Sequence, residues 1–296
     1  MTEAVTFVID VLSLGSLYAL MALGLVLVYG ILRLVNFAYG ELIMIAGYAL
    51  YLQNGSALPW LVMAVIAILA SIVASVATER IAFRPIREKS LTAMLITSFA
   101  VSTLLQNAAL LLISPRARVV PLPDIFTESF TVGSILVQYR DLFSILVTFA
   151  MLATFTLLLN RTVLGIALRA AADNFRMTRM LGVPANLVIS TAFAISGLLA
   201  GTVALFWLGR TASVTPGIGL EPLIVAFVAT VLGGIQSLVG AVLGGYLLAF
   251  MTVAINTFLP QALVDYRQAF TFALVILVLL FRPEGLVRAR GGGSRS

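Results

Sequence analysis

Apolar runs about as long as a bilayer is thick constrain this chain more than any other feature of its sequence. A helix needs roughly 17–25 consecutive apolar residues to cross the hydrocarbon region. The chain is 61% hydrophobic and 10% charged, whereas a soluble domain carries about 25% charged residues. The sequence therefore predicts an all-α polytopic integral membrane protein. The clearest expected spans are residues 60–77, 91–113, 142–159, 187–208, 238–258 and 269–281.

Two other regions affect the expected number of transmembrane helices. A polar break separates the apolar runs 12–35 and 42–52, and the apolar run 221–232 is too short to span a bilayer alone. We expect residues 221–232 to form a broken or re-entrant helix, which brings the count to about 8–9 transmembrane helices. Residues 1–290 are expected to form a single transmembrane domain, followed by a flexible tail at residues 291–296.

The polar break near the N-terminus predicts a pathway through the membrane. It has the sequence Asn-Phe-Ala-Tyr-Gly-Glu, residues 36–41. Lipid cannot hydrogen-bond such groups, so they are tolerated at membrane depth only where they pack in protein or line a water-filled cavity. The carboxylate of Glu41 costs several kcal/mol there unless it is paired, hydrated or protonated. Arg33, about two helical turns away, is one possible partner, and a structural or gate role for Glu41 is favoured over proton coupling.

Basic residues are clustered and predict the orientation of the chain. The positive-inside rule places such clusters in the cytoplasm, and with them the C-terminus. The three clusters are Arg80, Arg84, Arg87 and Lys89; Arg161, Arg169, Arg176 and Arg179; and Arg282, Arg288, Arg290 and Arg295.

The second of these clusters lies in a loop, residues 160–184, that is expected to contain an amphipathic helix. Ile166, Ala170, Met177 and Leu181 fall on one stripe of a helical wheel, with the arginines to one side. Arg169 and Asp173 are four residues apart and could pair, and Gly182 could close the helix. Two interpretations stay open: a connector lying on lipid headgroups, or a helix that docks into a groove of a cytoplasmic partner.

Small residues are dense in the C-terminal half. The spacings Gly197-x-x-x-Gly201 and Gly240-x-x-x-Gly244, the latter followed by Gly245, let helix backbones approach closely. Packing within the subunit is favoured, and a face against a second subunit is the alternative.

The residue inventory excludes several classes of function. The chain has no cysteine and no histidine, so disulfides, thiol catalysis, zinc–histidine sites and Ser-His-Asp triads are excluded. Its one lysine, Lys89, does not follow the spacing of a phosphate-binding loop. We therefore expect no enzyme activity, no catalytic or metal-binding residue and no cofactor in this chain. The basic balance is attributed to membrane orientation, not to nucleic acid.

At this point the motifs resemble those of the permeases of branched-chain amino acid ABC importers, the H-type permeases of the hydrophobic amino acid uptake family. The resemblance runs in order along essentially the whole chain. It is carried by residues 15–20, 28–31, 36–41, 79–87 and 105–107, by Gly165-x-x-x-Arg169-Ala170 with Asp173, and by residues 181–183, 231–235 and 281–286.

The resemblance implies a set of partners and two sites. The partners are a second related permease, two cytoplasmic ATPases that bind ATP and Mg²⁺, and an extracytoplasmic binding protein, all at the bacterial inner membrane. The loop 160–184 would couple to the ATPases through Gly165, Arg169, Asp173, Arg176, Leu181 and Gly182. The translocation pathway or gate would involve Asn36, Phe37, Tyr39, Glu41, Gln106, Asn107 and Glu221.

The leading hypothesis is thus the translocating subunit of an ATP-driven importer for branched-chain or other hydrophobic amino acids. One alternative is the same kind of importer with a urea, amide or aromatic carboxylate substrate. A different class, a proton-coupled secondary transporter of small organic solutes that uses Glu41 or Glu221, predicts uptake by this chain alone.

Overall fold

The computed structural model describes residues 2–287 except 88, 127, 133–134 and 284, so the expected tail at 291–296 lies outside the described residues. Four strands form two small two-stranded pairs, and the rest of the regular structure is helical, which confirms the all-α polytopic expectation. The helices are α1 (Thr2–Leu32), α2 (Tyr39–Leu52), α3 (Trp60–Thr78), α4 (Leu91–Leu112), α5 (Tyr139–Arg161), α6 (Val163–Met180), α7 (Ala185–Thr211), α8 (Leu220–Gly233), α9 (Leu238–Phe258) and α10 (Arg267–Phe281), with short helical turns at Glu79–Phe83, Asp124–Phe126 and Gln261–Tyr266.

Among the described residues, seven helices are long and apolar enough to cross a membrane. They correspond to α1, α3, α4, α5, α7, α9 and α10. The helices α2 and α8 are apolar but contain only 14 residues each, or about 21 Å of rise. Residues 221–232 therefore lie in a short helix, as expected, and the run after the polar break is a second short helix of the same length.

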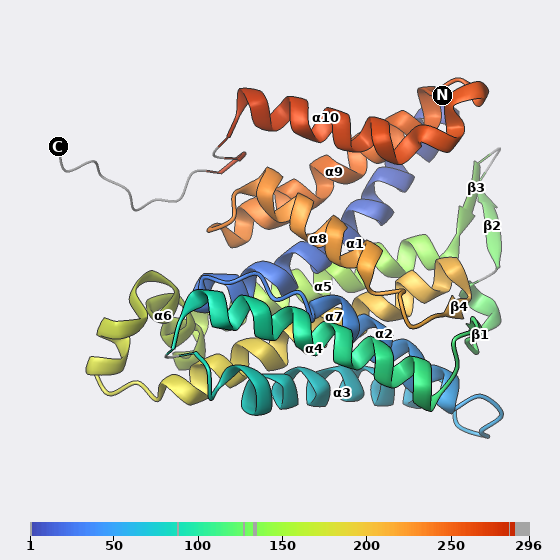
Figure 1. Ribbon diagram of the computed structural model, residues 1–296. Coiled ribbons are helices and arrows are strands. Elements are labelled where there is room, and N and C mark those ends of the chain that lie inside the picture. The colour runs from blue at the N-terminus through green and yellow to red at the C-terminus, as the bar shows by residue number, and fades with distance from the viewer. Residues whose placement is uncertain (1, 88, 127, 133–134, 284, 288–296) are drawn as a thin grey trace.

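The helix α1 is the centre of the bundle (Figure 1). Most of its long apolar stretch is buried, and it packs against α5, α7, α8 and α9. By contrast, α4 and α10 bury little of their surface and expose large apolar side chains such as Leu111 and Leu280. In a membrane protein such surfaces face lipid or another subunit.

Small residues bring the helices together within the subunit, as the glycine spacings predicted. A Cβ on Gly197 would lie 2.8 Å from the Ser71 carbonyl oxygen of α3, and one on Gly244 would lie 2.1 Å from the Ala229 carbonyl oxygen of α8. A Cβ on Gly245 would lie 2.5 Å from the Ala19 nitrogen of α1. Bilayer helices associate through close contact because lipid provides little hydrophobic drive between them.

The two ends of the bundle differ in structure (Figure 1). One end carries the strands, with β1 (Arg118–Val119) antiparallel to β4 (Ser213–Val214) and β2 (Ser129–Val132) antiparallel to β3 (Ile135–Gln138). The other end carries α6, which connects α5 to α7. The basic residues of the α3–α4 connection and of α6 lie at this second end.

Gly245→Ala should destabilise the protein because the added methyl group has no room against the backbone of α1. Overpacking costs roughly 1–3 kcal/mol, so the midpoint of thermal unfolding in detergent should fall. Gly217→Ala is the matched control, since nothing lies within 4 Å of its added Cβ. Equal midpoints for the two variants would contradict the close packing of α1 against α9.

Candidate functional site

The chain between α1 and α2 leaves the helical conformation, and its polar backbone groups bond to side chains. Asn36 is buried, and its Oδ1 accepts a hydrogen bond from the Ala38 backbone N–H at 3.1 Å. The Phe37 N–H donates to Ser98 Oγ of α4 at 2.9 Å. An asparagine side chain commonly satisfies backbone groups just before a helix in this way, so the sequence itself stabilises the break.

The Glu41 carboxylate lies in the first turn of α2 and is only 1% exposed. Its Oε1 accepts hydrogen bonds from Ser102 Oγ at 2.9 Å and from Gln106 Nε2 at 2.6 Å. Both donors come from α4. Its Oε2 is buried and has no hydrogen-bond partner in the described part of the chain. Such an oxygen costs free energy until a donor reaches it.

The pairing of Glu41 with Arg33, considered above as one possibility, is not formed. The helix α1 ends at Leu32, and Arg33 adopts a left-handed backbone conformation with φ of 55°. The helical spacing that would align Arg33 with Glu41 is therefore lost. The Arg33 guanidinium donates instead to the Ala172 carbonyl oxygen of α6 at 2.9 Å.

The two short helices meet at their N-terminal ends through a pair of glycines. A Cβ on Gly40 would lie 2.2 Å from the Gly219 carbonyl oxygen, and a Cβ on Gly219 would lie 2.2 Å from the Gly40 carbonyl oxygen. Only glycine fits at either position without a shift of the backbone. Two short helices that begin at one point inside a bundle are the arrangement by which many transporters form a site within the membrane.

The other candidate pathway residues take different positions. The Phe37 ring stacks on Phe99 of α4, with centroids 4.0 Å apart. Tyr39 is fully buried and points toward α1, where a Cβ on Gly24 would lie 2.4 Å from its hydroxyl. Asn107 is exposed and its Nδ2 donates to the Thr103 carbonyl oxygen. Glu221 is exposed in the first turn of α8. The structure thus brings Phe37 of the break and Glu41 of α2 against α4, which carries Gln106, and leaves Tyr39, Asn107 and Glu221 outside that cluster.

The expected helix in the loop 160–184 is α6, and its start is fixed by local sequence. The Thr162 hydroxyl caps it by accepting from the Gly165 N–H at 3.0 Å. A Cβ on Gly165 would lie 2.2 Å from the Leu158 carbonyl oxygen, so this glycine lets α6 fold closely against the end of α5. Gly182 closes the helix with φ of 84°, as predicted.

The side chains of α6 differ from the helical-wheel prediction in two respects. A kink at Asn174, with φ of −150° and ψ of 93°, interrupts the predicted continuous stripe. The stripe residue Leu181 is 84% exposed, and the buried side chains of α6 include Leu168 and Ala171, which are not on the predicted stripe. Arg169 Nη1 donates to Asn160 Oδ1 of α5 at 2.5 Å. The side chains of Asp173 and Arg176 lie outside the described residues.

A charged network at the opposite end of the bundle is absent from the sequence-based candidates. Ser13 Oγ donates to Asp141 Oδ1 at 2.6 Å, and the Arg210 guanidinium lies 3.1 Å from the same oxygen. These residues tie α1, α5 and α7 together, and Ser13 and Asp141 are buried. The available signal was the presence of Asp141 and Arg210 at the ends of apolar runs. Within the described ranges, no three His, Cys, Asp or Glu side chains converge to hold a metal ion.

Comparison with known proteins gives similarity over nearly the whole chain. The profile of the family described as "Branched-chain amino acid transport system / permease component" matches residues 7–279. The high-affinity branched-chain amino acid transport system permease protein BraD of Pseudomonas aeruginosa is 36% identical over 292 residues, covering 93% of both chains. The corresponding LivH protein of Escherichia coli K12 is 33% identical, covering 93% of this chain and 92% of its own.

The Asp141–Arg210 pair should show energetic coupling in a double-mutant cycle. Asp141→Ala and Arg210→Ala should each lower the midpoint of thermal unfolding, because each removes the charge that compensates the other. The double variant should lose less free energy of unfolding than the two single variants lose together, and the difference, the coupling energy, should be about 0.5–3 kcal/mol. A parallel cycle between Asp141 and the exposed Arg267 should be additive. Additivity in both cycles would contradict a stabilising role for the network.

Proposed function

This chain belongs to the family of permease components of branched-chain amino acid transport systems, and on that premise we propose how its own residues carry out transport. It is a multi-pass membrane protein and the translocating subunit of an ABC importer, which acts with ATPase and binding-protein subunits. The substrates that we propose are branched-chain or other hydrophobic amino acids. We further propose a heterodimer with a related permease, two cytoplasmic ATPases that hold the ATP and Mg²⁺, and a bacterial inner-membrane location with the C-terminus in the cytoplasm.

The observation that carries the proposed pathway is the unpartnered oxygen of Glu41. An amino acid is a zwitterion, and its ammonium group is a donor that suits a buried carboxylate oxygen. The Glu41 side chain is held by Ser102 and Gln106 through its other oxygen, so Oε2 is oriented and available to a donor. The stacked rings of Phe37 and Phe99 lie beside the same two helices and provide apolar surface for an aliphatic side chain. Together they offer one polar and one apolar contact to such a substrate.

Access to Glu41 requires α4 to move relative to α2, because the carboxylate is almost fully buried. The helix α4 is suited to this motion. Its buried residues are Met94, Ser98 and Ala109. Its polar contacts are that of Ser98 with Phe37 in the break and those of Ser102 and Gln106 with Glu41 of α2. Elements with few buried apolar contacts open at the lowest free-energy cost. On opening, Glu41 would lose its hydrogen bonds from Ser102 and Gln106 and accept one from the substrate ammonium group instead.

The helix α6 is proposed to receive the motion of the ATPases. Ile166, Met177 and Leu181 are exposed, and an exposed apolar face on a short helix is what a groove in a partner recognises. Gly165 and the Arg169–Asn160 hydrogen bond fix α6 to α5. The Arg33–Ala172 hydrogen bond fixes it to the residue that starts the break before α2. Displacement of α6 therefore acts on the segment that carries Asn36 and leads to Glu41.

Glu41→Gln should lower uptake of labelled leucine about tenfold or more, since loss of one charge-assisted contact of about 1.5–3 kcal/mol corresponds to that change. The measurement uses proteoliposomes with the binding protein, the ATPases and ATP. Asn107→Ala is the control, because Asn107 is exposed and bonds within its own helix. Wild-type uptake should need ATP and persist when a protonophore collapses the pH gradient. Uptake by this chain alone, driven by a pH gradient, would support the proton-coupled alternative and overturn the proposal.

Arg33→Gln should leave the assembled complex intact but lower the leucine transported per ATP hydrolysed, because it removes the link between α6 and the break. Leu181→Glu should have the opposite profile: less ATPase co-purifies with the permease because a charge enters the exposed apolar face. The two quantities are measured on the same preparations. An Arg33→Gln complex with wild-type transport per ATP would show that force reaches the break by another route.

A further inference from the structure

The C-terminal end of the short helix α8 is held by residues that follow α10. A helix leaves its last four carbonyl oxygens without partners of its own, and in α8 the first two of these bond to the N–H of the residue that follows the helix. The Leu286 N–H donates to the Leu232 carbonyl oxygen at 2.9 Å. The Val287 N–H donates to the Gly233 carbonyl oxygen at 3.1 Å. The segment 285–287 thus supplies the partners of the last two carbonyl groups of α8.

Gly285 lets this segment lie directly on the turn after α8. It is buried and has φ of 79°, in the left-handed region where a residue with a side chain is strained. A Cβ at this position would lie 2.6 Å from the Gly234 nitrogen and 3.0 Å from the Gly233 carbonyl carbon. Both the backbone conformation and the close approach therefore require glycine here.

The N-terminal end of α8 adjoins the turn that carries Glu41. Gly219, the residue before α8, is in backbone contact with Gly40, and a Cβ on Gly219 would also lie 3.1 Å from the Glu41 nitrogen. The helix between these ends has 14 residues, or about 21 Å of rise. It therefore connects the segment 285–287 to the first turn of α2.

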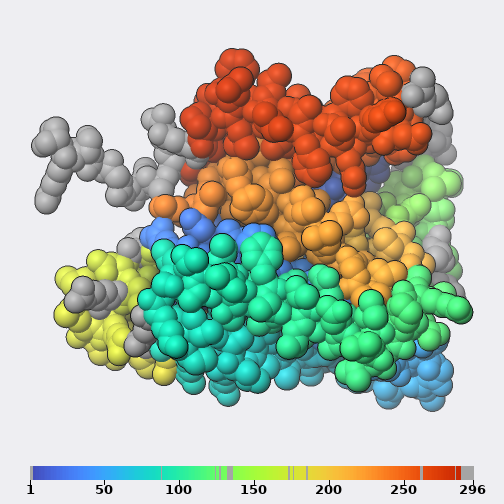
Figure 2. Space-filling model, in the orientation of Figure 1, coloured from blue at the N-terminus to red at the C-terminus, as the bar shows by residue number. Residues whose placement is uncertain are grey.

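The sides of α8 are packed unequally. It packs mainly against α1 and α9, whereas its outer side reaches the surface of the chain between α4 and α10 (Figure 2). Leu220, Ile224 and Phe227 are exposed on that side. Within the described part of the chain, the position of α8 thus depends on one packed side and on the contacts at its two ends.

The segment 285–287 lies at the end of the bundle that carries α6 (Figure 1). The helix α10 runs toward this end and stops at Phe281. The Arg33–Ala172 hydrogen bond already connects α6 to the break before α2. The contacts of α8 form a separate connection, which reaches Glu41 from the other side of the break.

We propose that the segment 285–287 positions Glu41 through α8, which makes Gly285 a positioning residue for transport. This role rests on the proposed contact of Glu41 with the substrate ammonium group. Coupling between distant positions can be carried by rigid secondary elements. The helix α8 is such an element, because backbone contacts fix it at one end to the segment and at the other to the turn of Glu41.

The test is a double-variant cycle on leucine uptake in proteoliposomes that contain the binding protein, the ATPases and ATP. Gly285→Ala should lower the uptake rate about fivefold, because strain at a positive φ displaces the segment from the end of α8. In the Glu41→Gln background the same substitution should lower the rate less than about twofold, since both changes remove the same contact with the substrate. Each rate is divided by the amount of assembled complex, so a loss of folded protein does not count.

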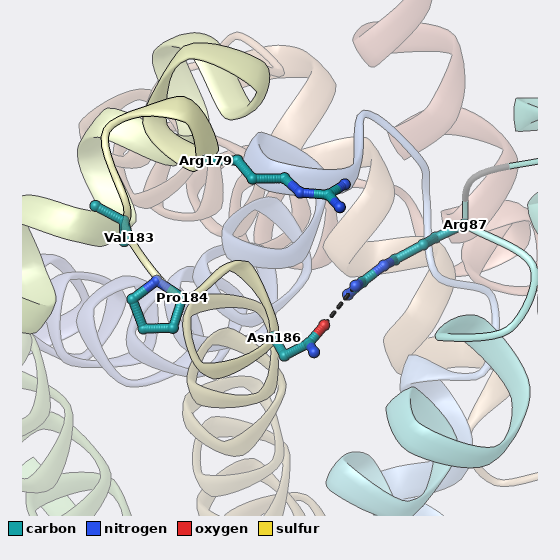
Figure 3. A pocket seen from close by; sticks show the side chains of 5 residues that line it. All are labelled: Arg87, Arg179, Val183, Pro184 and Asn186. Carbon is teal, nitrogen blue, oxygen red and sulfur yellow. Dashed lines mark hydrogen bonds between the residues drawn. The ribbon is translucent and has the colours of Figure 1, made fainter.

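Two variants are matched controls. Gly55→Ala places a side chain at φ of 82° where nothing lies within 4 Å, so it adds comparable backbone strain away from α8. Asn186→Ala removes the hydrogen bond from Arg87 at the end of the bundle that carries α6 (Figure 3). Both should keep wild-type uptake. Val287→Pro removes only the N–H that bonds to α8, and it should show the same dependence on Glu41 if Gly285→Ala does not assemble.

The contrary outcomes differ in meaning. A fivefold loss in both backgrounds would show that Gly285→Ala acts independently of Glu41 and would overturn the positioning role. Wild-type uptake in both Gly285→Ala and Val287→Pro would overturn it as well. A loss in either control equal to that in Gly285→Ala would assign the effect to backbone strain or to that end of the bundle in general. Wild-type uptake in Glu41→Gln alone would overturn the proposed function, and the positioning role with it.

Discussion

Hydrocarbon offers no hydrogen-bond partner, and the break between α1 and α2 satisfies that constraint with side chains from its own segment and from α4. Asn36 accepts from the backbone of Ala38, and Ser98 accepts from that of Phe37. Ser102 and Gln106 then hold one oxygen of Glu41. The polar groups of α4 are spaced four residues apart, at 98, 102 and 106, which places them on one face of that helix. A single polar face on a weakly packed helix thus stabilises an irregular segment and leaves one carboxylate oxygen for a further donor.

Glycine contacts complement this arrangement because they bring backbones close without interlocking side chains. The central helix α1 is packed closely by α9 at Gly245, and α7 by α3 at Gly197. The contact between Gly40 and Gly219 differs from these since it joins the first turns of α2 and α8, the two helices that are too short to span. The two short helices therefore meet, backbone against backbone, where the break ends and α2 begins.

The sequence predicts the spanning helices well because the length of an apolar run is a local property that the bilayer thickness constrains directly. The break at residues 36–41 is found for the same reason, since polar groups stand out in an apolar run. Partners are harder to predict. The suggestion of Arg33 as one possible partner for Glu41 assumed a continuous helix, but α1 ends at Leu32. The Asp141–Arg210 pair and the Gly40–Gly219 contact join residues far apart in the chain, and one sequence holds no information on such pairs. The kink at Asn174 likewise could not be predicted, because a helical wheel assumes one continuous helix with the same rotation at every residue.

The position of Arg33 explains how a surface helix can influence a site inside the bundle. Arg33 stands directly after the last residue of α1 and in the left-handed conformation that ends the helix. Its side chain reaches α6, while its backbone leads into the break. On the proposal that the ATPases act on α6, a push there would be delivered where the chain is least regular, next to α1, which is packed on several sides. Coupling of this kind requires an element with two arrangements that both sites bias. The break, held by a few side-chain hydrogen bonds to α4, is the segment of this bundle that best meets that requirement.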